Sequence, residues 1–179
     1  MLGNAQRIAT LAVLVLSAGA SVAAPAPTAA VGKPASVAFE RLKALAGEWV
    51  AADDNEMVKK GDLVARYAVT AGGSAVVETV FPGRAHEMVT VYHADGPDLV
   101  LTHYCTEGNQ PRMRAKGAQG TRFDFAYDGG TNIDPKRDRH MHSASLALLS
   151  ADEIRSEWTE LADGKPVLVV KSHLVRSAR

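Results

Sequence analysis

The residues best suited to chemistry cluster in one short region of the chain. They combine imidazole, phenol, thiol, amide and guanidinium groups and comprise His103, Tyr104, Cys105, Asn109, Gln110 and Arg112. The two amides offer donors and acceptors, and a guanidinium is a planar fork that suits a carboxylate. At the rim of a barrel, such side chains could grip the polar head of an amphipathic ligand. The alternative is a hydrogen-bonded turn that only fixes one hairpin.

Three histidines suggest a second kind of chemistry. His140 and His142 are two residues apart, so they share one face of a strand, and His103 could join them. Imidazoles suit zinc or copper. However, the sequence names no fourth ligand, it contains neither HExxH nor CxxC, and His86-Glu87 lacks the second histidine of a zincin. We therefore expect no metal, and we expect His142 to supply a polar contact to a bound ligand.

An enzyme is a further alternative. Glu78, Glu87 and Glu160 could be buried carboxylates with raised pKa values, which is how a general base can arise inside a barrel. They could equally be structural partners of arginine or histidine. The chain has no Gly-x-Ser-x-Gly elbow, P-loop or dinucleotide fingerprint. An enzyme is therefore not the preferred interpretation, and a purely structural role also stays open.

Composition limits the class of protein. Of 179 residues, 46% are hydrophobic and 22% are charged, which suits one globular domain and not a disordered tail. The formal net charge is zero, and the only basic cluster, 136–139, is interrupted by an acid, so we expect no nucleic-acid partner. Cys105 is the only cysteine, so no internal disulfide can form. A buried, unreactive thiol is the simpler interpretation.

The N-terminus has the pattern of an export signal. Arg7 precedes an uncharged apolar stretch at 8–20, and small residues follow at 21–23, so we predict a signal peptide at 1–23. Residues 24–36 are rich in Ala and Pro and predict a linker to a domain at 37–179. The apolar stretch is short for a membrane span, and an uncleaved anchor is the alternative. We expect a periplasmic or secreted protein with no membrane span in its mature form.

The remaining chain has to position the candidate residues, and its pattern is that of strands. A short helix is predicted from 39 to Gly47, where apolar residues recur at helical spacing. Period-two alternation between turn signals then predicts about ten strands, at 48–53, 62–71, 74–81, 86–93, 99–105, 112–117, 121–127, 140–149, 154–160 and 167–176. The one long loop is 128–139. A meander of this length closes to avoid open edges, so the predicted fold is mainly β, a closed antiparallel barrel.

Alternation also predicts which side chains face inward. The face that carries Phe123, Phe125 and Tyr127 is aromatic, and Trp158 lies opposite charged neighbours, so these four should line a cavity together with Leu146. In the last strand, Lys171 should face outward because an unpaired buried ammonium is costly, and His173 shares its face. The faces of the hairpin over 86–105 are both partly apolar, so its orientation stays open.

Two motifs resemble known families. A short helix that ends in Gly47-Glu48-Trp49, at the start of the first strand, resembles the opening of calycin barrels such as lipocalins and fatty-acid-binding proteins. The resemblance implies that a basic residue in the last strand, here Arg176, packs over Trp49 and closes the barrel, through cation–π attraction and hydrogen bonds. The segments 90–96, 101–105 and 108–113 also resemble a family of exported bacterial lipocalin-like proteins, which implies fold and export only.

Haem is the alternative that this resemblance raises. Nitrobindin-like barrels, which also belong to the calycin type, carry an axial histidine near the C-terminus, and His173-Leu174 before Arg176 is similar to that context. Only a β-bulge would turn His173 inward. The preferred interpretation is therefore a barrel that binds a small apolar or amphipathic molecule without a cofactor. In this interpretation His103, Asn109, Gln110, Arg112 and His142 supply the polar contacts.

Overall fold

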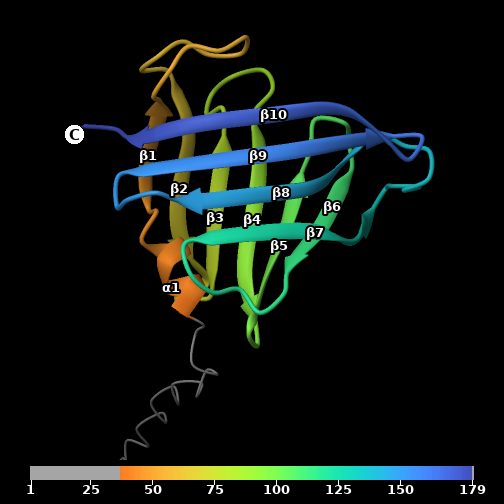
Figure 1. Cartoon of the computed structure of the whole chain (residues 1–179), viewed down its shortest axis with the longest axis horizontal. Helices are drawn as coiled ribbons and strands as arrows, with labels where there is room; N and C mark the ends of the chain where they lie inside the picture. The colour runs from red at the N-terminus through yellow and green to blue at the C-terminus, as the bar shows by residue number, and fades with distance from the viewer. Residues whose placement is uncertain (1–36, 179) are drawn as a thin grey trace, which may run out of the picture. The chain divides into compact units, whose positions relative to one another are not determined.

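The computed structural model describes residues 37–178, so the predicted signal peptide and linker lie outside the described residues. One short helix, α1 (Val37–Lys43), precedes ten strands (Figure 1). The strands are β1 (Gly47–Ala51), β2 (Leu63–Thr70), β3 (Ala75–Val80), β4 (Met88–Asp95), β5 (Asp98–Tyr104), β6 (Gln110–Ala115), β7 (Arg122–Thr131), β8 (His140–Leu148), β9 (Glu153–Ala162) and β10 (Lys165–Arg176). Within 37–178, no helix is long and apolar enough to cross a membrane.

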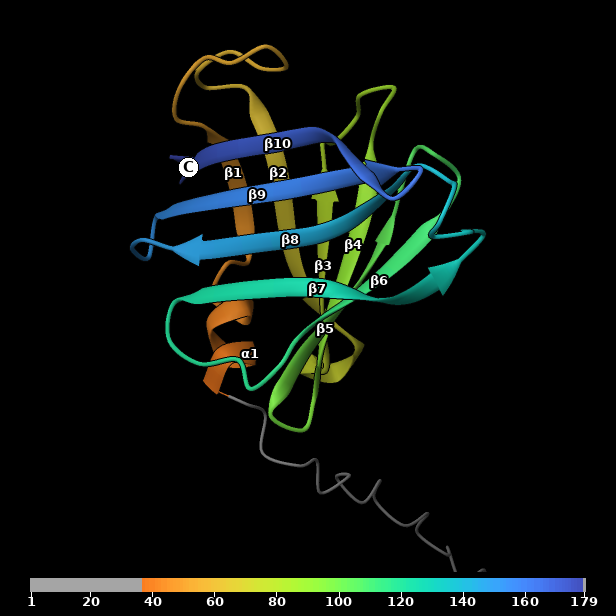
Figure 2. The same cartoon turned by 45° about the vertical axis from the view of Figure 1, so that its right-hand side comes forward.

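The strands form a closed antiparallel barrel. Each strand pairs with its neighbours in sequence, and β1 pairs with β10, where Trp49 lies opposite Arg176. Figure 2 shows β10, β9, β8 and β7 crossing in front of β1 to β5. Most connections between consecutive strands are short, and a short connection places the second strand antiparallel and next to the first. The predicted mainly-β fold, with a closed meander of about ten strands and a short helix, is confirmed.

The predicted strands differ most from the structure at the end of β7. The strand expected at 121–127 extends to Thr131, so the loop expected at 128–139 is shorter. The extension passes through Gly129 and Gly130, which look like turn residues in the sequence. Gly130 pairs with Pro111 of β6 so closely that a Cβ on Gly130 would lie 2.8 Å from the Gln110 carbonyl oxygen. The glycine is there for close backbone approach and not for a turn.

The hairpin whose orientation was open is now defined. Its connection is the two-residue turn Gly96-Pro97, so Thr90 lies opposite His103 and Tyr92 lies opposite Leu101. Even-numbered residues of β4 therefore share a face with odd-numbered residues of β5. All four of these side chains are buried, because this register turns them into the barrel.

The helix end of the barrel is closed. Trp49 is fully buried there and donates from Nε1 to the Leu45 carbonyl at 2.8 Å. The Arg176 guanidinium lies 4.5 Å from the centre of the Trp49 ring. It also donates to the carbonyls of Ala44, Ala46 and Ala151, so one side chain ties the segment after α1 to the turn between β8 and β9. A binding site inside the barrel would therefore have to open at the end opposite α1.

Candidate functional site

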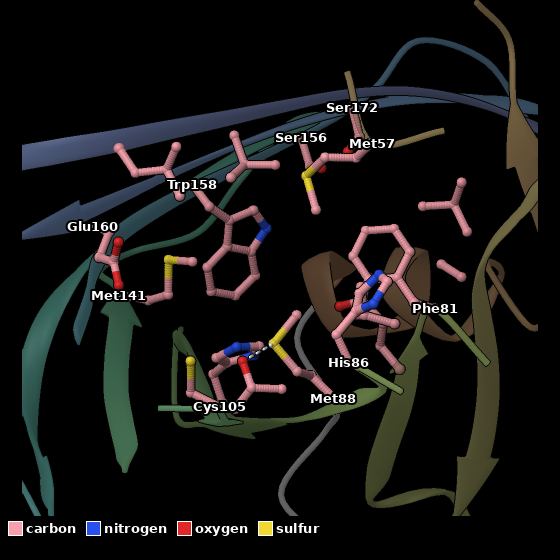
Figure 3. Close-up of a pocket in the computed structure, with 18 of the residues that line it drawn as sticks. Met57, Phe81, His86, Met88, Cys105, Met141, Ser156, Trp158, Glu160 and Ser172 are labelled. Atoms are coloured by element: carbon pink, nitrogen blue, oxygen red, sulfur yellow. Dashed lines mark hydrogen bonds between the residues drawn. The ribbon is translucent and has the colours of Figure 1, made fainter. Parts of the chain in front are cut away.

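A cavity of about 290 Å³ opens at the end of the barrel away from α1. Its mouth is formed by the loops that follow β1, β3, β5 and β7, and its walls come from inward faces of the strands. Most of the lining is apolar (Figure 3). The apolar lining residues are Met57, Val64, Ala65, Val80, Phe81, Met88, Met141, Trp158, Leu168, Val170 and Leu174.

The mouth combines an aromatic pair with flexible methionines. Phe81 and His86 lie against each other, with ring centres 4.6 Å apart, as Figure 3 shows. Phe81 has a φ of 54°, in the left-handed region that a bulky residue rarely adopts. Residues held in that region are often found at ligand sites. Met57, Met88 and Met141 add side chains that adapt to different shapes.

His103 is the most unusual polar residue of the cavity. Only 3% of it is exposed, and its ring packs against Trp158 with ring centres 5.0 Å apart. Nδ1 is hydrogen-bonded to the Thr90 hydroxyl at 2.9 Å, whereas Nε2 is buried and has no hydrogen-bond partner within residues 37–178. Burial lowers the pKa of His103 to about 4, so the ring is neutral near neutral pH.

Glu78 lies at the inner end of the cavity. Its carboxyl group accepts hydrogen bonds from the hydroxyls of Tyr67 at 2.7 Å and Tyr92 at 2.6 Å. Burial raises the pKa of Glu78, while the two tyrosine hydrogen bonds oppose that rise. Thr90, on the same strand as Tyr92, is hydrogen-bonded to His103 instead. The polar groups inside the barrel therefore form two small clusters, one around Glu78 and one made by Thr90 and His103.

A second buried carboxylate lies near the mouth. The Glu160 side chain is 3% exposed and is bonded to Arg139, with oxygen–nitrogen distances of 2.5 and 3.2 Å. Arg139 is itself half exposed and follows the loop after β7. Arg139 compensates the buried charge of Glu160, and its guanidinium is therefore not free to pair with the charge of a ligand.

Two titratable groups of the cavity, His103 and Cys105, do not suit base or nucleophilic catalysis. A general base works best with a pKa near the working pH, and His103 is far below it. Burial raises the pKa of the Cys105 thiol, so the reactive thiolate is disfavoured. Glu78, whose pKa is raised, is instead engaged by two tyrosine hydroxyls.

Two of the predicted ligand residues line this cavity. His103 is on β5, and Trp158 of β9 extends its indole ring into the cavity (Figure 3). Phe125 borders only a small space of about 10 Å³ further inside, and Phe123 is 1% exposed in the packed core. Leu146, also expected at the cavity, borders the same small space.

Three predicted residues lie on the outer wall instead. Tyr104 is 50% exposed, and together with Gln110 and Arg112 it borders a shallow surface depression. Alternation explains Tyr104, because His103 next to it points inward. Arg112 lies where the register of β6 shifts against β7, and it pairs with Asp128 at 3.6 Å. The three residues are therefore not part of the cavity.

Asn109, Tyr127 and His142 are also outside the cavity lining. Asn109 is buried and donates to the Arg139 carbonyl at 2.7 Å, which fixes the loop before β8. Tyr127 stacks on His142 with ring centres 5.1 Å apart, and His140 packs against both rings. A bulge between Met141 and Ser143 changes the alternation of β8 and places Met141, rather than His142, at the cavity.

The histidines do not gather around a metal position. His140 and His142 contact each other at 3.1 Å, between Nε2 and Nδ1. His103 instead lies against Trp158 in the cavity. In the described part of the chain, no group of three histidine, cysteine or acidic residues is arranged to hold a metal ion.

His173 faces outward, as the alternation of β10 predicted. Leu168, Val170, Ser172 and Leu174 of the same strand line the cavity. Both ring nitrogens of His173 are engaged, Nδ1 with Asp53 at 2.6 Å and Nε2 with Glu153 at 2.8 Å. The residue that motivated the haem alternative therefore neither points into the cavity nor has a free nitrogen for an axial bond.

Several lining residues were not identified from the sequence. Met57, Phe81 and His86 lie in loops, where no alternation indicates facing, and Met88 is in the hairpin whose orientation was open. The positive φ of Phe81 has no sequence signal, because it is imposed by tertiary packing. Glu78 was noted as a buried carboxylate, but its tyrosine partners were not foreseen.

Comparisons with known proteins do not indicate a function for this chain, so the proposal below is argued from the cavity. No protein-family model matches the chain, and no curated protein is significantly similar to it.

Proposed function

We propose that this chain is an exported calycin-type protein that binds a small apolar or amphipathic molecule inside its barrel. The observation that carries the proposal is the mainly apolar cavity of about 290 Å³, which opens opposite the closed helix end. Ligand pockets have this character, with an apolar lining and a few polar groups, and span roughly 300–1,000 Å³. The cavity volume lies just below that range, which favours a small ligand.

The energetics favour burial of apolar surface. A ligand that buries about 200 Å² of apolar area gains roughly 5 kcal/mol before the cost of association is subtracted. Few polar groups on the lining need to be desolvated, because Glu78 and Glu160 already have hydrogen-bond partners. The lining therefore favours apolar contacts as the main source of affinity.

Separate features support the calycin and export parts of the proposal. The helix, the Gly-x-Trp start of β1 and the Arg176–Trp49 contact are the features that the resemblance implies. Export rests on the N-terminal pattern of Arg7 and the apolar stretch at 8–20. Purification from a producing cell, with analysis of the N-terminus by mass spectrometry, checks whether residues 1–23 are removed in the exported fraction.

Binding is tested with N-phenylnaphthylamine, a neutral dye whose fluorescence rises in apolar surroundings. Val170→Phe extends a side chain into the cavity and should weaken dye binding about tenfold or more. Val169→Phe is the matched control, because Val169 is on the outer face of the same strand and is 47% exposed. Equal affinities of wild type and both variants would contradict binding in the cavity.

A further inference from the structure

The inner wall made by β9 and β10 carries polar side chains that no other residue engages. Ser156 and Trp158 are two residues apart on β9 and line the cavity, and Ser172 of β10 lies directly opposite Ser156. All three are partly buried, and none of them forms a hydrogen bond with another group of residues 37–178. Figure 3 shows the two serines near each other, and it shows the Trp158 nitrogen on the side of the ring that faces the cavity, away from Glu160. The wall therefore offers unused hydrogen-bonding groups in a mainly apolar cavity.

The indole of Trp158 decides what such a ligand has to present. An indole N–H can only donate a hydrogen bond, whereas a serine hydroxyl can donate or accept. An N–H that is enclosed by protein usually has an acceptor, and in apolar surroundings a ligand acceptor gains more from it than it would in water. The His103 ring packs against the indole, with ring centres 5.0 Å apart, so the donor is already positioned before a ligand enters. The ligand should therefore carry a hydrogen-bond acceptor.

The charges around the cavity select against anionic acceptors. Glu78, Glu107 and Glu160 all line it. In the part of the chain that the structure describes, Arg139 is the only arginine or lysine on the lining, and it is bonded to Glu160. A ligand carboxylate would therefore be desolvated beside carboxyl groups without a free cation. The acceptor should be a neutral group.

We infer that Trp158 Nε1–H, assisted by the hydroxyls of Ser156 and Ser172, donates to the carbonyl oxygen of an uncharged, mostly apolar ligand. A carbonyl oxygen has two lone pairs, so it can accept from the indole and from one hydroxyl at the same time. This inference rests on the proposed function and names the ligand class of the same site. Apolar ketones and esters belong to that class, whereas carboxylates and hydrocarbons do not.

Three probes that share a phenyl ring separate these classes. Acetophenone has a neutral carbonyl, α-methylstyrene has a CH₂ group in place of the carbonyl oxygen, and benzoate is an anion. Isothermal titration calorimetry of the purified protein measures the affinity of each probe without a dye or a tryptophan signal. We expect acetophenone to bind the wild type at least about tenfold more tightly than benzoate.

The variant Trp158→Phe isolates the indole N–H, because it keeps an aromatic ring and removes the donor. Its affinity for acetophenone should fall about three- to tenfold more than its affinity for α-methylstyrene, as expected for one hydrogen bond. The change in ring size affects both probes and cancels in this comparison.

A second variant and a control complete the test. The double variant Ser156→Ala/Ser172→Ala should also weaken acetophenone binding selectively, and it decides the test if Trp158→Phe does not fold. Tyr104→Phe removes a hydroxyl from the outer wall, where Tyr104 is 50% exposed, and should bind all three probes as the wild type does.

The outcomes distinguish this inference from the proposed function. Equal losses of affinity for acetophenone and α-methylstyrene in Trp158→Phe, or tighter binding of benzoate than of acetophenone by the wild type, would overturn the inference. If N-phenylnaphthylamine binds in the cavity but acetophenone does not, the inference fails and the proposed function stands. If neither the dye nor any of the three probes binds, both fail.

Discussion

At the scale of single residues, the interior of this barrel is notable for a carboxyl group held by two tyrosines. Glu78 is buried on β3, and its partners Tyr67 and Tyr92 are on the two neighbouring strands. The hydrogen bonds stabilise the charged form, but desolvation is the larger effect and raises the pKa of Glu78. Ionisation of Glu78 therefore costs stability in the folded protein.

The pH dependence of stability should report this cost. Since the folded-state pKa of Glu78 lies above its value in the unfolded chain, its favourable contribution is full below the unfolded value of about 4.3 and is lost as pH rises through the folded pKa. As pH rises from about 4.3 through the folded pKa, the free energy of unfolding of the wild type should fall relative to that of Glu78→Gln. The slope of this difference should be at most about 1.4 kcal/mol per pH unit.

Urea unfolding of both proteins between pH 4 and pH 8 measures the difference. Far-ultraviolet circular dichroism establishes that Glu78→Gln is folded. A wild-type advantage that grows with pH would mean that the two tyrosines outweigh burial, which is the opposite balance.

At the scale of elements, an exposed cluster ties three segments together. His173 of β10 bonds to Asp53, which follows β1, and to Glu153, at the start of β9. The two carboxylates raise the pKa of His173, whereas Arg155 on β9 opposes that effect. The segment between β1 and β2 also carries Met57 at the cavity mouth, so the cluster lies next to the element that borders the opening.

This cluster should stabilise the protein mainly at acidic pH. Because the pKa of His173 is raised in the folded state, its contribution is full below the unfolded value of about 6.5 and is lost as pH rises through the folded pKa. We expect His173→Gln to cost about 0.5–1 kcal/mol at pH 5.5 and progressively less at higher pH, since the partners are partly exposed.

Thermal or urea unfolding from pH 5.5 to pH 9 checks this expectation. Lys171→Gln is the matched control, because Lys171 is on the same strand and its pair with Glu157 is exposed. A cost of His173→Gln that is constant over this range, or that rises with pH, would show that the cluster does not act through a charged His173.

At the scale of the whole molecule, the barrel depends on its closing seam. Only three residue pairs join β1 to β10, at Trp49–Arg176, Val50–Val175 and Ala51–Leu174. Arg176 strengthens this short seam through the Trp49 ring and three backbone carbonyls. Gly47 allows the close approach, because a Cβ there would lie 3.1 Å from a guanidinium nitrogen.

Loss of Arg176 should therefore destabilise the entire barrel. We expect Arg176→Gln to lower the free energy of unfolding by about 2–4 kcal/mol, and Arg176→Lys to lower it by less, because the lysine keeps the charge but not the planar fork. A double-mutant cycle with Trp49→Phe should give a coupling energy of about 1 kcal/mol. Both are measured by urea unfolding, and strictly additive effects would exclude an energetic contact between the two side chains.

The architecture could be predicted from the sequence because its signals are local. Turn residues between alternating stretches determine the order of the strands, and a long meander has to close to satisfy its edges. The same alternation predicted Trp158 at the cavity and His173 on the outer wall. It failed where a glycine serves close packing, as at Gly130, and where a bulge exchanges neighbours, as at Met141 and His142.

By itself, the sequence therefore determined the class of fold, the approximate strands and the facing of side chains within regular strands. Only the tertiary structure decided which polar residues share a site. His103, Thr90, Tyr92 and Glu78 come from three strands, and their hydrogen bonds depend on a register set by the whole closed barrel. The local sequence pattern does not predict these registers. A shift of one residue in a turn or bulge moves the inward-facing side chains of a strand to its outer face.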